Sequence, residues 1–281
     1  MLHTFKRVVV LINNIKNIDE LLQKGIEFSK QHKTTLEVLF VQEKPSHSLF
    51  DYFLSSSSET YSPLDKDMVK AKIQKYIDEL DNSIQSEVFI VEEDTLQRVL
   101  THGKEGRNIL FITNYNEKLS QKLLEKTPYS YWIFKNDSLN HTNILLPIVL
   151  SESAKEDIKL TQDIFPKSSI GIVHDYRYKI PTIKSDGFVS IIPIVSNIDS
   201  EFHKEAREKQ KNIFEDYKKE FNVKGDFIEE KKGVEKDLLN YIKNRDTDLI
   251  VLHHQEEEMF IPSLTFNLLD EVPNDFLVIN R

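Results

Sequence analysis

The sequence predicts an α/β protein of two similar halves, each a parallel five-stranded sheet with helices on both faces. Short uninterrupted apolar runs such as Leu249–Leu252 alternate with amphipathic helical segments. Such runs are typical of strands that are buried on both faces of a parallel sheet. Matching elements also recur about 140 residues apart, with Val8 corresponding to Ile144 and Pro128 to Pro273. The recurrence predicts an internal duplication, and a single large doubly wound domain is the alternative.

The first half begins with a strand at Arg7–Ile12, where consecutive apolar residues end at Asn13. Apolar residues at helical spacing then predict a helix from Ile18 to Ser29. After a second strand, Lys44–Leu64 contains two prolines and a run of four serines, which predict a long loop. The remaining predicted elements are helices at 69–80, 96–100 and 119–124, and strands at Leu36–Val41, Val88–Val91, Ile109–Ile112 and Tyr131–Phe134.

The second half repeats this order after a polar linker at Asn136–His141. Ser153 and Glu156 predict a capping box at the start of its first helix. The apolar segment Phe188–Val195 is an addition that either packs on its own domain or forms an interface. We therefore predict domains at 1–138 and 141–281. The other predicted elements are strands at Ile144–Val149, Ser169–His174, Phe227–Ile228, Leu249–Leu252 and Phe276–Ile279, and helices at 202–221, 234–242 and 264–269.

The composition limits the classes of function. Among 281 residues, 37 Lys and Arg stand against 46 Asp and Glu, a net charge of −9, which argues against nonspecific binding to nucleic acid or to an anionic membrane. The absence of cysteine excludes disulfides, thiolate catalysis and cysteine-ligated metals. The first apolar run, Val8–Ile12, is too short for a signal segment or a membrane span, and we expect a cytoplasmic protein.

Three segments of the second half carry a family resemblance. They read Asn143-Ile-Leu-Leu-Pro-Ile-Val149, Asp248-Leu-Ile-Val-Leu-His253 and Pro273-Asn-Asp-Phe-Leu-Val-Ile-Asn-Arg281. The first half repeats them more faintly at Arg7–Asn13, Asn108–Thr113 and Pro128–Lys135. The chain thus resembles a tandem universal stress protein. The resemblance implies two Rossmann-like (adenine nucleotide alpha hydrolase-like) domains whose last strands pair, either as an internal pseudo-dimer of the two halves or in a homodimer.

The family's ATP-binding members resemble one another in a Gly-x-x-Gly segment after the fourth strand and a Gly-Ser or Gly-Thr that opens the last helix. Glycine lets backbone N–H groups approach phosphate with no Cβ in the way. This chain has only seven glycines, where average usage would give about 20. The corresponding places, which hold no glycine, are His254–Phe260 and Pro262-Ser263 in the second half, and Asn114–Asn116 and Glu117-Lys118 in the first.

Two further departures point the same way. The three consecutive glutamates at Glu256–Glu258 would repel a triphosphate, or form a solvated loop or a docking surface for a basic partner. The family's aspartate at the end of the first strand, which faces the nucleotide, is replaced by Asn13 in one half and by Val149 in the other. The resemblance therefore implies a member of the class that does not bind ATP, and we expect no cofactor.

Candidate site residues are few. Asn13 ends the first strand of its half, and His174 and His253 end the second and fourth strands of theirs, so these three are the crevice candidates. A metal site that adds His254 and Glu256 is an alternative, but the spacing matches no ligand motif. We therefore predict solvated or hydrogen-bonded histidines and no metal. The pair Gly103-x-x-Gly106 precedes the fourth strand, at the wrong edge for phosphate, and predicts a helix end.

No catalytic motif occurs: the chain lacks a Gly-x-Ser-x-Gly elbow, a His-Glu-x-x-His pair and a Walker loop. We therefore predict no catalytic residues and a non-enzymatic module that acts in the stress response through contacts with an unknown protein partner. One alternative is a sensor that binds a small molecule or nucleotide in remodelled crevices. Another is a weak nucleotide hydrolase.

Overall fold

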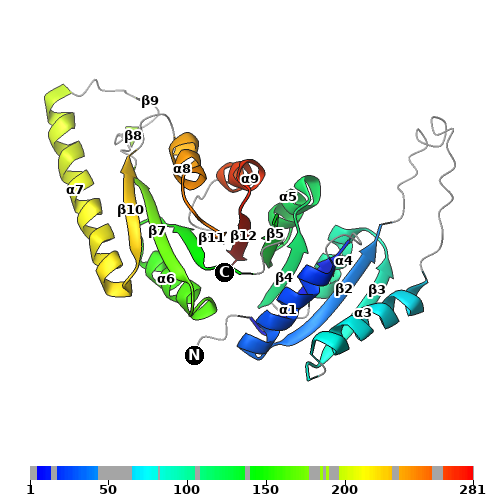
Figure 1. Cartoon of the computed structure of the whole chain (residues 1–281). Helices are drawn as coiled ribbons and strands as arrows, with labels where there is room; N and C mark the ends of the chain where they lie inside the picture. Colours follow the sequence, from blue (N-terminus) through cyan, green and yellow to red (C-terminus); the bar gives the residue numbers. More distant parts are fainter. Residues whose placement is uncertain are drawn as a thin grey trace. The chain divides into compact units, whose positions relative to one another are not determined.

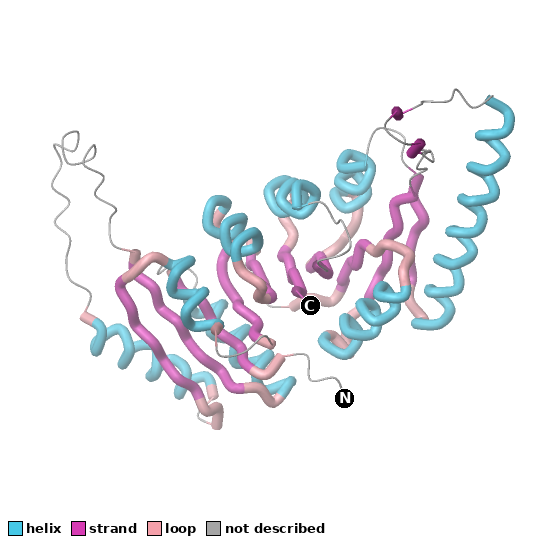
Figure 2. The backbone as a smooth tube through the Cα atoms, turned by 180° about the vertical axis from the view of Figure 1, so that it is seen from behind, coloured by secondary structure: helices cyan, strands magenta, loops and turns pink. Residues whose placement is uncertain are grey.

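The computed structural model (Figure 1) describes residues 5–13, 18–43, 65–81, 83–104, 108–136, 140–176, 184–185, 188–189, 196–229, 234–254 and 262–280. Strands and helices alternate along these residues, as Figure 2 shows, which confirms the predicted α/β class. The predicted loop at 44–64, the acidic run at 256–258, Gly106 and residues 190–195 of the added apolar segment lie outside the described residues.

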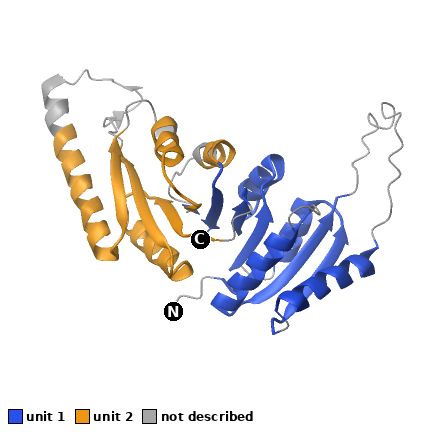
Figure 3. Ribbon diagram, viewed as in Figure 1, with its two compact units in different colours: residues 1–139, 253–262, 273–281 blue, residues 140–252, 263–272 orange. Residues whose placement is uncertain are grey.

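The chain divides into two compact units, coloured separately in Figure 3. Unit 1 comprises residues 1–139, 253–262 and 273–281, and unit 2 comprises residues 140–252 and 263–272. These units are defined by contacts in space, whereas the predicted domains 1–138 and 141–281 are defined by recurrence in the sequence. The domain boundaries therefore stay a prediction.

Unit 1 is built on a sheet of order β12-β5-β4-β1-β2-β3. Strands β1 to β5 run parallel to their neighbours, as predicted for the first half. The order reverses at β1, which lies between β4 and β2, and in such sheets the ligand crevice opens at the carboxyl ends of these strands. The strands are β1 (Arg7–Ile12), β2 (Thr35–Gln42), β3 (Ser86–Glu92), β4 (Ile109–Asn114), β5 (Ser130–Phe134) and β12 (Asp275–Asn280).

In the described residues, four helices cover this sheet: α1 (Ile18–His32), α3 (Lys66–Leu80), α4 (Thr95–Gly103) and α5 (Glu117–Lys126). Helix α1 contacts α3, and α4 contacts α5, and Figure 1 shows the two pairs on opposite faces. Gly25 permits the close approach of α1 to β1, because a Cβ there would lie 2.3 Å from Cγ2 of Val10. Gly103 ends α4 against the ring of Tyr129, in agreement with the predicted helix end.

Unit 2 contains a parallel sheet of order β10-β7-β6-β11. Its longest helix, α7, packs against α6 and against β7 and β10. Strands β8 (Lys184–Ser185) and β9 (Phe188–Val189) form a separate antiparallel pair, which includes the start of the added apolar segment. The other elements are β6 (Asn143–Pro147), α6 (Glu152–Ile164), β7 (Ser169–Tyr176), α7 (Ser196–Phe221), β10 (Lys224–Glu229), α8 (Val234–Lys243), β11 (Leu249–His254) and α9 (Pro262–Glu271).

None of the helices in the described residues has both the length and the apolar character that a membrane crossing requires.

The last strand of the chain, β12, groups with unit 1 and pairs antiparallel with β5. Phe276 lies opposite Ile133, and Val278 opposite Tyr131. Both strands are buried over most of their length, and a buried parallel sheet whose outer strand lacked a partner would leave backbone N–H and C=O groups unsatisfied. The antiparallel β12 satisfies this need, and the sheet of unit 1 is therefore mixed.

The start of the second half differs from the prediction. Strand β6 ends at Pro147, and Val149 is 43% exposed. Helix α6 begins at Glu152 with Ser151 as its N-cap, so Ser153 already lies in the first turn and the predicted capping box is wrong. Ser151 adopts the extended backbone of an N-cap, so the helix starts two residues earlier than predicted. Oγ of Ser151 lies 2.6 Å from Oγ of Ser153.

Candidate functional site

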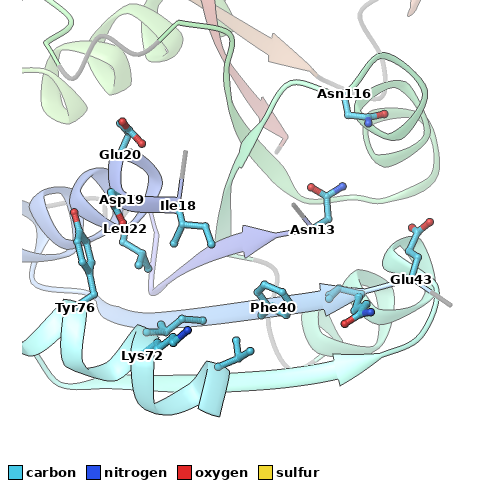
Figure 4. A pocket seen from close by; sticks show the side chains of 14 residues that line it. Asn13, Ile18, Asp19, Glu20, Leu22, Phe40, Glu43, Lys72, Tyr76 and Asn116 are labelled. Carbon is cyan, nitrogen blue, oxygen red and sulfur yellow. The ribbon is translucent and has the colours of Figure 1, made fainter. Parts of the chain in front are cut away.

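A cavity of about 1020 Å³ opens in unit 1 at the carboxyl ends of β1 and β2 (Figure 4). Its walls come from the ends of these strands, the beginning of α1 and one face of α3. Six lining residues are apolar: Ile18, Leu22, Phe40, Val41, Val69 and Ile73. Eight are polar or charged, or carry a hydroxyl: Asn13, Asp19, Glu20, Gln42, Glu43, Lys72, Tyr76 and Asn116.

The apolar floor follows directly from the periodicity of the sequence. Phe40 and Val41 close a buried run on β2. Ile18 and Leu22 are four residues apart on α1, and Val69 and Ile73 are four apart on α3, so each pair shares one face of its helix. Because α1 and α3 contact each other, the two faces meet over the end of β2.

The charge of the lining is negative. Among the described lining residues, Asp19, Glu20 and Glu43 are three carboxylates and Lys72 is one ammonium, which gives a balance of −2. Asp19 and Glu20 stand in the first turn of α1, where they complement the positive end of the helix dipole. Burial, and then the negative charges of Asp19 and Glu20, raise the pKa of Tyr76. The cavity therefore favours neutral or cationic groups over anions.

Asn13 lies where the prediction put it, directly after β1 and in the lining of the cavity. Its side chain is half-buried. An amide offers both a donor and an acceptor without charge, unlike the aspartate that the family resemblance would place there. Whether Asn13 binds a ligand stays a prediction.

The amino end of α5 is occupied by side chains of the chain itself. Oδ1 of Asn116 accepts a hydrogen bond from N–H of Leu119 at 3.0 Å, and N–H of Asn116 donates to Oγ of Ser120 at 3.1 Å. Glu117 adds a carboxylate to the first turn. This is the place where the family resemblance puts the glycine that opens the last helix. An incoming phosphate would have to displace the cap and approach Glu117.

The amino end of α4 is arranged in the same way. Oδ1 of Asp94 accepts from N–H of Gln97 at 2.9 Å, and Oε1 of Glu43 accepts from N–H of Thr95 at 3.3 Å. Carboxylates thus stand at the starts of α1, α4 and α5, three of the helices that begin near this edge of the sheet. Each helix start is already compensated by protein charge or by a protein acceptor.

In unit 2, His174 is part of the interior and only 7% exposed. Its Nδ1 lies 2.9 Å from the backbone oxygen of Ile148, and its Nε2 lies 3.1 Å from Oε1 of Gln210. The ring also contacts the rings of Phe214 and Phe227. Both ring nitrogens therefore have protein partners, which is the hydrogen-bonded state that the sequence analysis favoured over a metal ligand.

His253 is half-buried near the end of β11 and groups with unit 1, whereas His174 belongs to unit 2. Because the two histidines belong to different units, their place in one crevice stays a prediction. In the part of the chain that the structure describes, no group of three or more His, Asp or Glu side chains is arranged to hold a metal ion. Glu256 of the alternative metal site lies outside the described residues.

Several residues of the cavity had no recognisable signal in the sequence. Lys72 and Tyr76 lie on α3 beside the apolar positions Val69 and Ile73, but only the packing of α3 against α1 turns them toward the crevice. Glu43 follows β2 directly, and its place at the carboxyl end of a strand could have indicated a crevice residue.

Comparisons with known proteins find matches in structure. No protein-family profile and no curated protein sequence matches the chain. A protein of unknown function from Pseudomonas aeruginosa PAO1 superposes with a TM-score of 0.70 and 10% identity, over 99% of this chain and 93% of that one.

Two further solved structures carry a family name. One, from Pseudomonas aeruginosa UCBPP-PA14 and classed provisionally as a universal stress protein, has a TM-score of 0.64, 10% identity and coverage of 99% and 94%. The other, a universal stress protein from Archaeoglobus fulgidus DSM 4304, has a TM-score of 0.60, 14% identity and 98% coverage of both chains. At such identities the likeness concerns the fold. Over nearly its whole length, the chain therefore has the Rossmann-like fold of universal stress proteins.

Proposed function

We propose that the chain is a non-enzymatic universal stress protein-like module that acts in the stress response through protein contacts and does not bind ATP in the crevice of unit 1. Two features support this. The fold is shared with universal stress proteins. The amino end of α5, where a phosphate would be held, is capped by Asn116 and flanked by Glu117.

The amino end of α5 carries this proposal. A triphosphate is stabilised where unpaired backbone N–H groups and a positive helix end point at it. Here N–H of Leu119 already has an acceptor, and Asp19, Glu20 and Glu43 line the cavity nearby. At a separation of about 5 Å and an effective dielectric near 20, each pair of unit negative charges costs roughly 3 kcal/mol. Lys72, the one lysine among the described lining residues, offsets only part of this repulsion.

Isothermal titration of the full chain with Mg-ATP tests the absence of ATP binding. We expect no heat of binding at micromolar protein and up to 1 mM ATP, roughly the upper end of ordinary substrate affinities. Near-stoichiometric binding would overturn the proposal. Phosphate release from ATP, lost in the variant His253→Ala, would instead support the weak hydrolase.

The partner proposed first is the chain itself. The antiparallel pairing of β5 with β12 supports an internal pseudo-dimer, because these are the last strands of the two sequence halves. Light scattering of the full chain tests whether a homodimer also forms: an internal pseudo-dimer that satisfies the last strands predicts a mass of 33.0 kDa. A further protein partner and a cytoplasmic location, which fits the absence of cysteine, are parts of the same proposal.

A second candidate function is a small-molecule sensor, and the cavity beside Asn13 favours it. Its volume of about 1020 Å³ is at the upper end of the range for sites of drug-sized ligands, about 300–1,000 Å³. Native mass spectrometry of freshly purified protein should then show a retained mass that denaturing conditions release. A screen of nucleotides and small metabolites that produces no thermal shift, together with no retained mass, would reject this candidate.

A further inference from the structure

We propose that the cavity of unit 1 binds an amphipathic organic cation, that is, an ammonium group carried on an apolar body. This inference rests on the second candidate function, the small-molecule sensor, and adds to it the chemical class of the ligand. Three features of the lining lead to it: an apolar floor, carboxylates at its margin and an aromatic ring beside them.

The apolar lining residues favour a ligand with an apolar body. Ile18 and Val69 are apolar lining residues that remain half-buried, and they lie beside the buried Leu22, Phe40 and Ile73. A ligand that covered this floor would remove apolar surface from water, at about 25 cal/mol per Å². A small inorganic cation or a fully hydrated polyamine would leave the floor wet and gain none of this free energy.

The carboxylates at the margin of the cavity favour a ligand with a positive charge. Figure 4 shows Asp19, Glu20 and Tyr76 toward one end of the cavity, and Glu43 toward the other, beyond Phe40. Burial, and then the negative charges of Asp19 and Glu20, raise the pKa of Tyr76, in agreement with the place of these side chains at one end of the cavity in Figure 4. Carboxylates attract an ammonium group by ion pairing, and a nearby aromatic ring can add a cation–π contact.

Lys72 is the lining residue that opposes this inference. It stands on α3 and is exposed, as are Asp19 and Glu43, so water screens all three charges, while Glu20 is half-buried. Among the lining residues that the structure describes, three carboxylates stand against this one ammonium, so their summed charge is negative. An anionic ligand of the same shape would meet one favourable charge and three unfavourable ones.

Three fluorescent probes with one dansyl body test the ligand class. Dansylcadaverine carries a terminal ammonium, N-dansyl-6-aminohexanoate a carboxylate, and N-hexyl dansylamide no charge. We expect fluorescence titration of the full chain at low salt to give at least about tenfold tighter binding of the cation than of the anion, with the neutral probe between them. The preference should shrink toward 1 M salt, where the Debye length falls to about 3 Å.

Three substitutions test whether the probe binds in the cavity. Glu20→Gln should weaken the cation by about fivefold and leave the neutral probe unchanged, because it removes a charge and keeps the shape. Glu87→Gln removes the same charge from an exposed position on β3 outside the lining, and should change nothing. Val69→Trp fills the cavity and should weaken all three probes, while its thermal melting curve shows that it remains folded.

Each outcome decides the inference. Equal affinity for the three probes, or a preference for the anion, overturns it. So does cation binding that survives Val69→Trp in a variant that melts cooperatively, because the probe is then held elsewhere. If no probe binds but native mass spectrometry shows a retained neutral or anionic molecule, the cation class is wrong and the sensor function stands. If no mass is retained and no probe binds, both fail together.

Discussion

Oδ1 of Asp275 accepts a hydrogen bond from the backbone N–H of Lys135 at 2.8 Å, although the two residues are 140 positions apart in the chain. The same oxygen accepts from N–H of Asn136 at 3.0 Å. Asp275 is the first residue of β12, and Lys135 directly follows β5. This carboxylate therefore ties the two residues after β5 to the start of β12. Only 1% of Asp275 is exposed, and both hydrogen bonds are partly buried.

The variant Asp275→Ala should lower the free energy of unfolding of unit 1 by about 2–4 kcal/mol. It leaves the N–H groups of Lys135 and Asn136 without the acceptor of two part-buried hydrogen bonds, and an unsatisfied buried group costs roughly 1–3 kcal/mol. Urea unfolding measures the loss. Asp275→Asn keeps an acceptor oxygen of the same shape and should lose less.

Glu125→Ala serves as the control for this pair. Glu125 is an exposed carboxylate on α5, and its truncation should change the free energy of unfolding by less than about 0.5 kcal/mol. If Asp275→Ala unfolded at the same urea concentration as Glu125→Ala, the carboxylate would not hold β12 to β5.

Gly25→Ala should destabilise unit 1 by about 1–3 kcal/mol, the usual cost of overpacking a core. The new Cβ would lie 2.3 Å from Cγ2 of Val10 and 3.2 Å from Cδ1 of Leu36, so α1 would have to move away from the sheet. Thermal melting measures the effect. The lining residues Ile18 and Leu22 are on the same helix, so the shape of the cavity should change as well.

The matched control for Gly25→Ala is Gly171→Ala on β7. A Cβ at Gly171 meets its nearest neighbours only at 3.8–3.9 Å, which is ordinary van der Waals contact. This variant should be neutral, or slightly stabilising because alanine restricts the unfolded chain. If the two substitutions destabilised the protein equally, the packing of α1 on the sheet would not require the absence of a side chain at Gly25.

His174→Ala should destabilise unit 2 by about 2–4 kcal/mol. It removes a buried ring and leaves Ile148 and Gln210 without the nitrogens that lie at 2.9 and 3.1 Å. Lys204→Ala, on the exposed face of α7, is the control. If His174→Ala were as stable as Lys204→Ala, the structural role of His174 would be contradicted, and a role in ligand binding would again be the alternative.

The sequence predicted best those elements that end in an unambiguous signal. Strand β1 has the predicted bounds because Asn13 interrupts an apolar run, and α5 stops just before Pro128. Where two signals competed, the prediction failed. Ser151 and Ser153 are both of a residue type that favours the N-cap position, and the helix begins directly after Ser151.

The partner of the last strand could not be predicted from the pattern of β12. The run Phe276–Ile279 indicates burial on both faces but not the direction or identity of the neighbouring strand. The candidate site was predictable for Asn13, because the end of β1 falls at the strand-order reversal. Tyr76 and Lys72 were not predictable, since their position depends on how α3 rotates against α1.

A buried charge cluster near the amino ends of β1 and β2 should make the stability of unit 1 depend on pH. Glu37 on β2 accepts from Nε of Arg7 at 2.5 Å and from Nη2 at 2.7 Å, and its Oε2 lies 2.6 Å from Nε2 of His102. Burial by itself would raise the pKa of Glu37, but the hydrogen bonds of Arg7 and His102 outweigh it and lower the pKa to about 2. An unfolded glutamate titrates near 4.3.

Because the folded pKa is the lower one, the ionised form of Glu37 stabilises the fold above the unfolded pKa. This contribution, on the order of 3 kcal/mol, should be complete at pH 6 and disappear progressively between about pH 5 and pH 2. Urea unfolding at pH 6, 5, 4 and 3 measures it, with Glu37→Gln as the comparison. The variant should be less stable at pH 6, since Arg7 loses its partner, and the difference from the parent protein should narrow as the pH falls. A difference that stayed constant from pH 6 to pH 3 would contradict the lowered pKa and leave only packing as the role of Glu37.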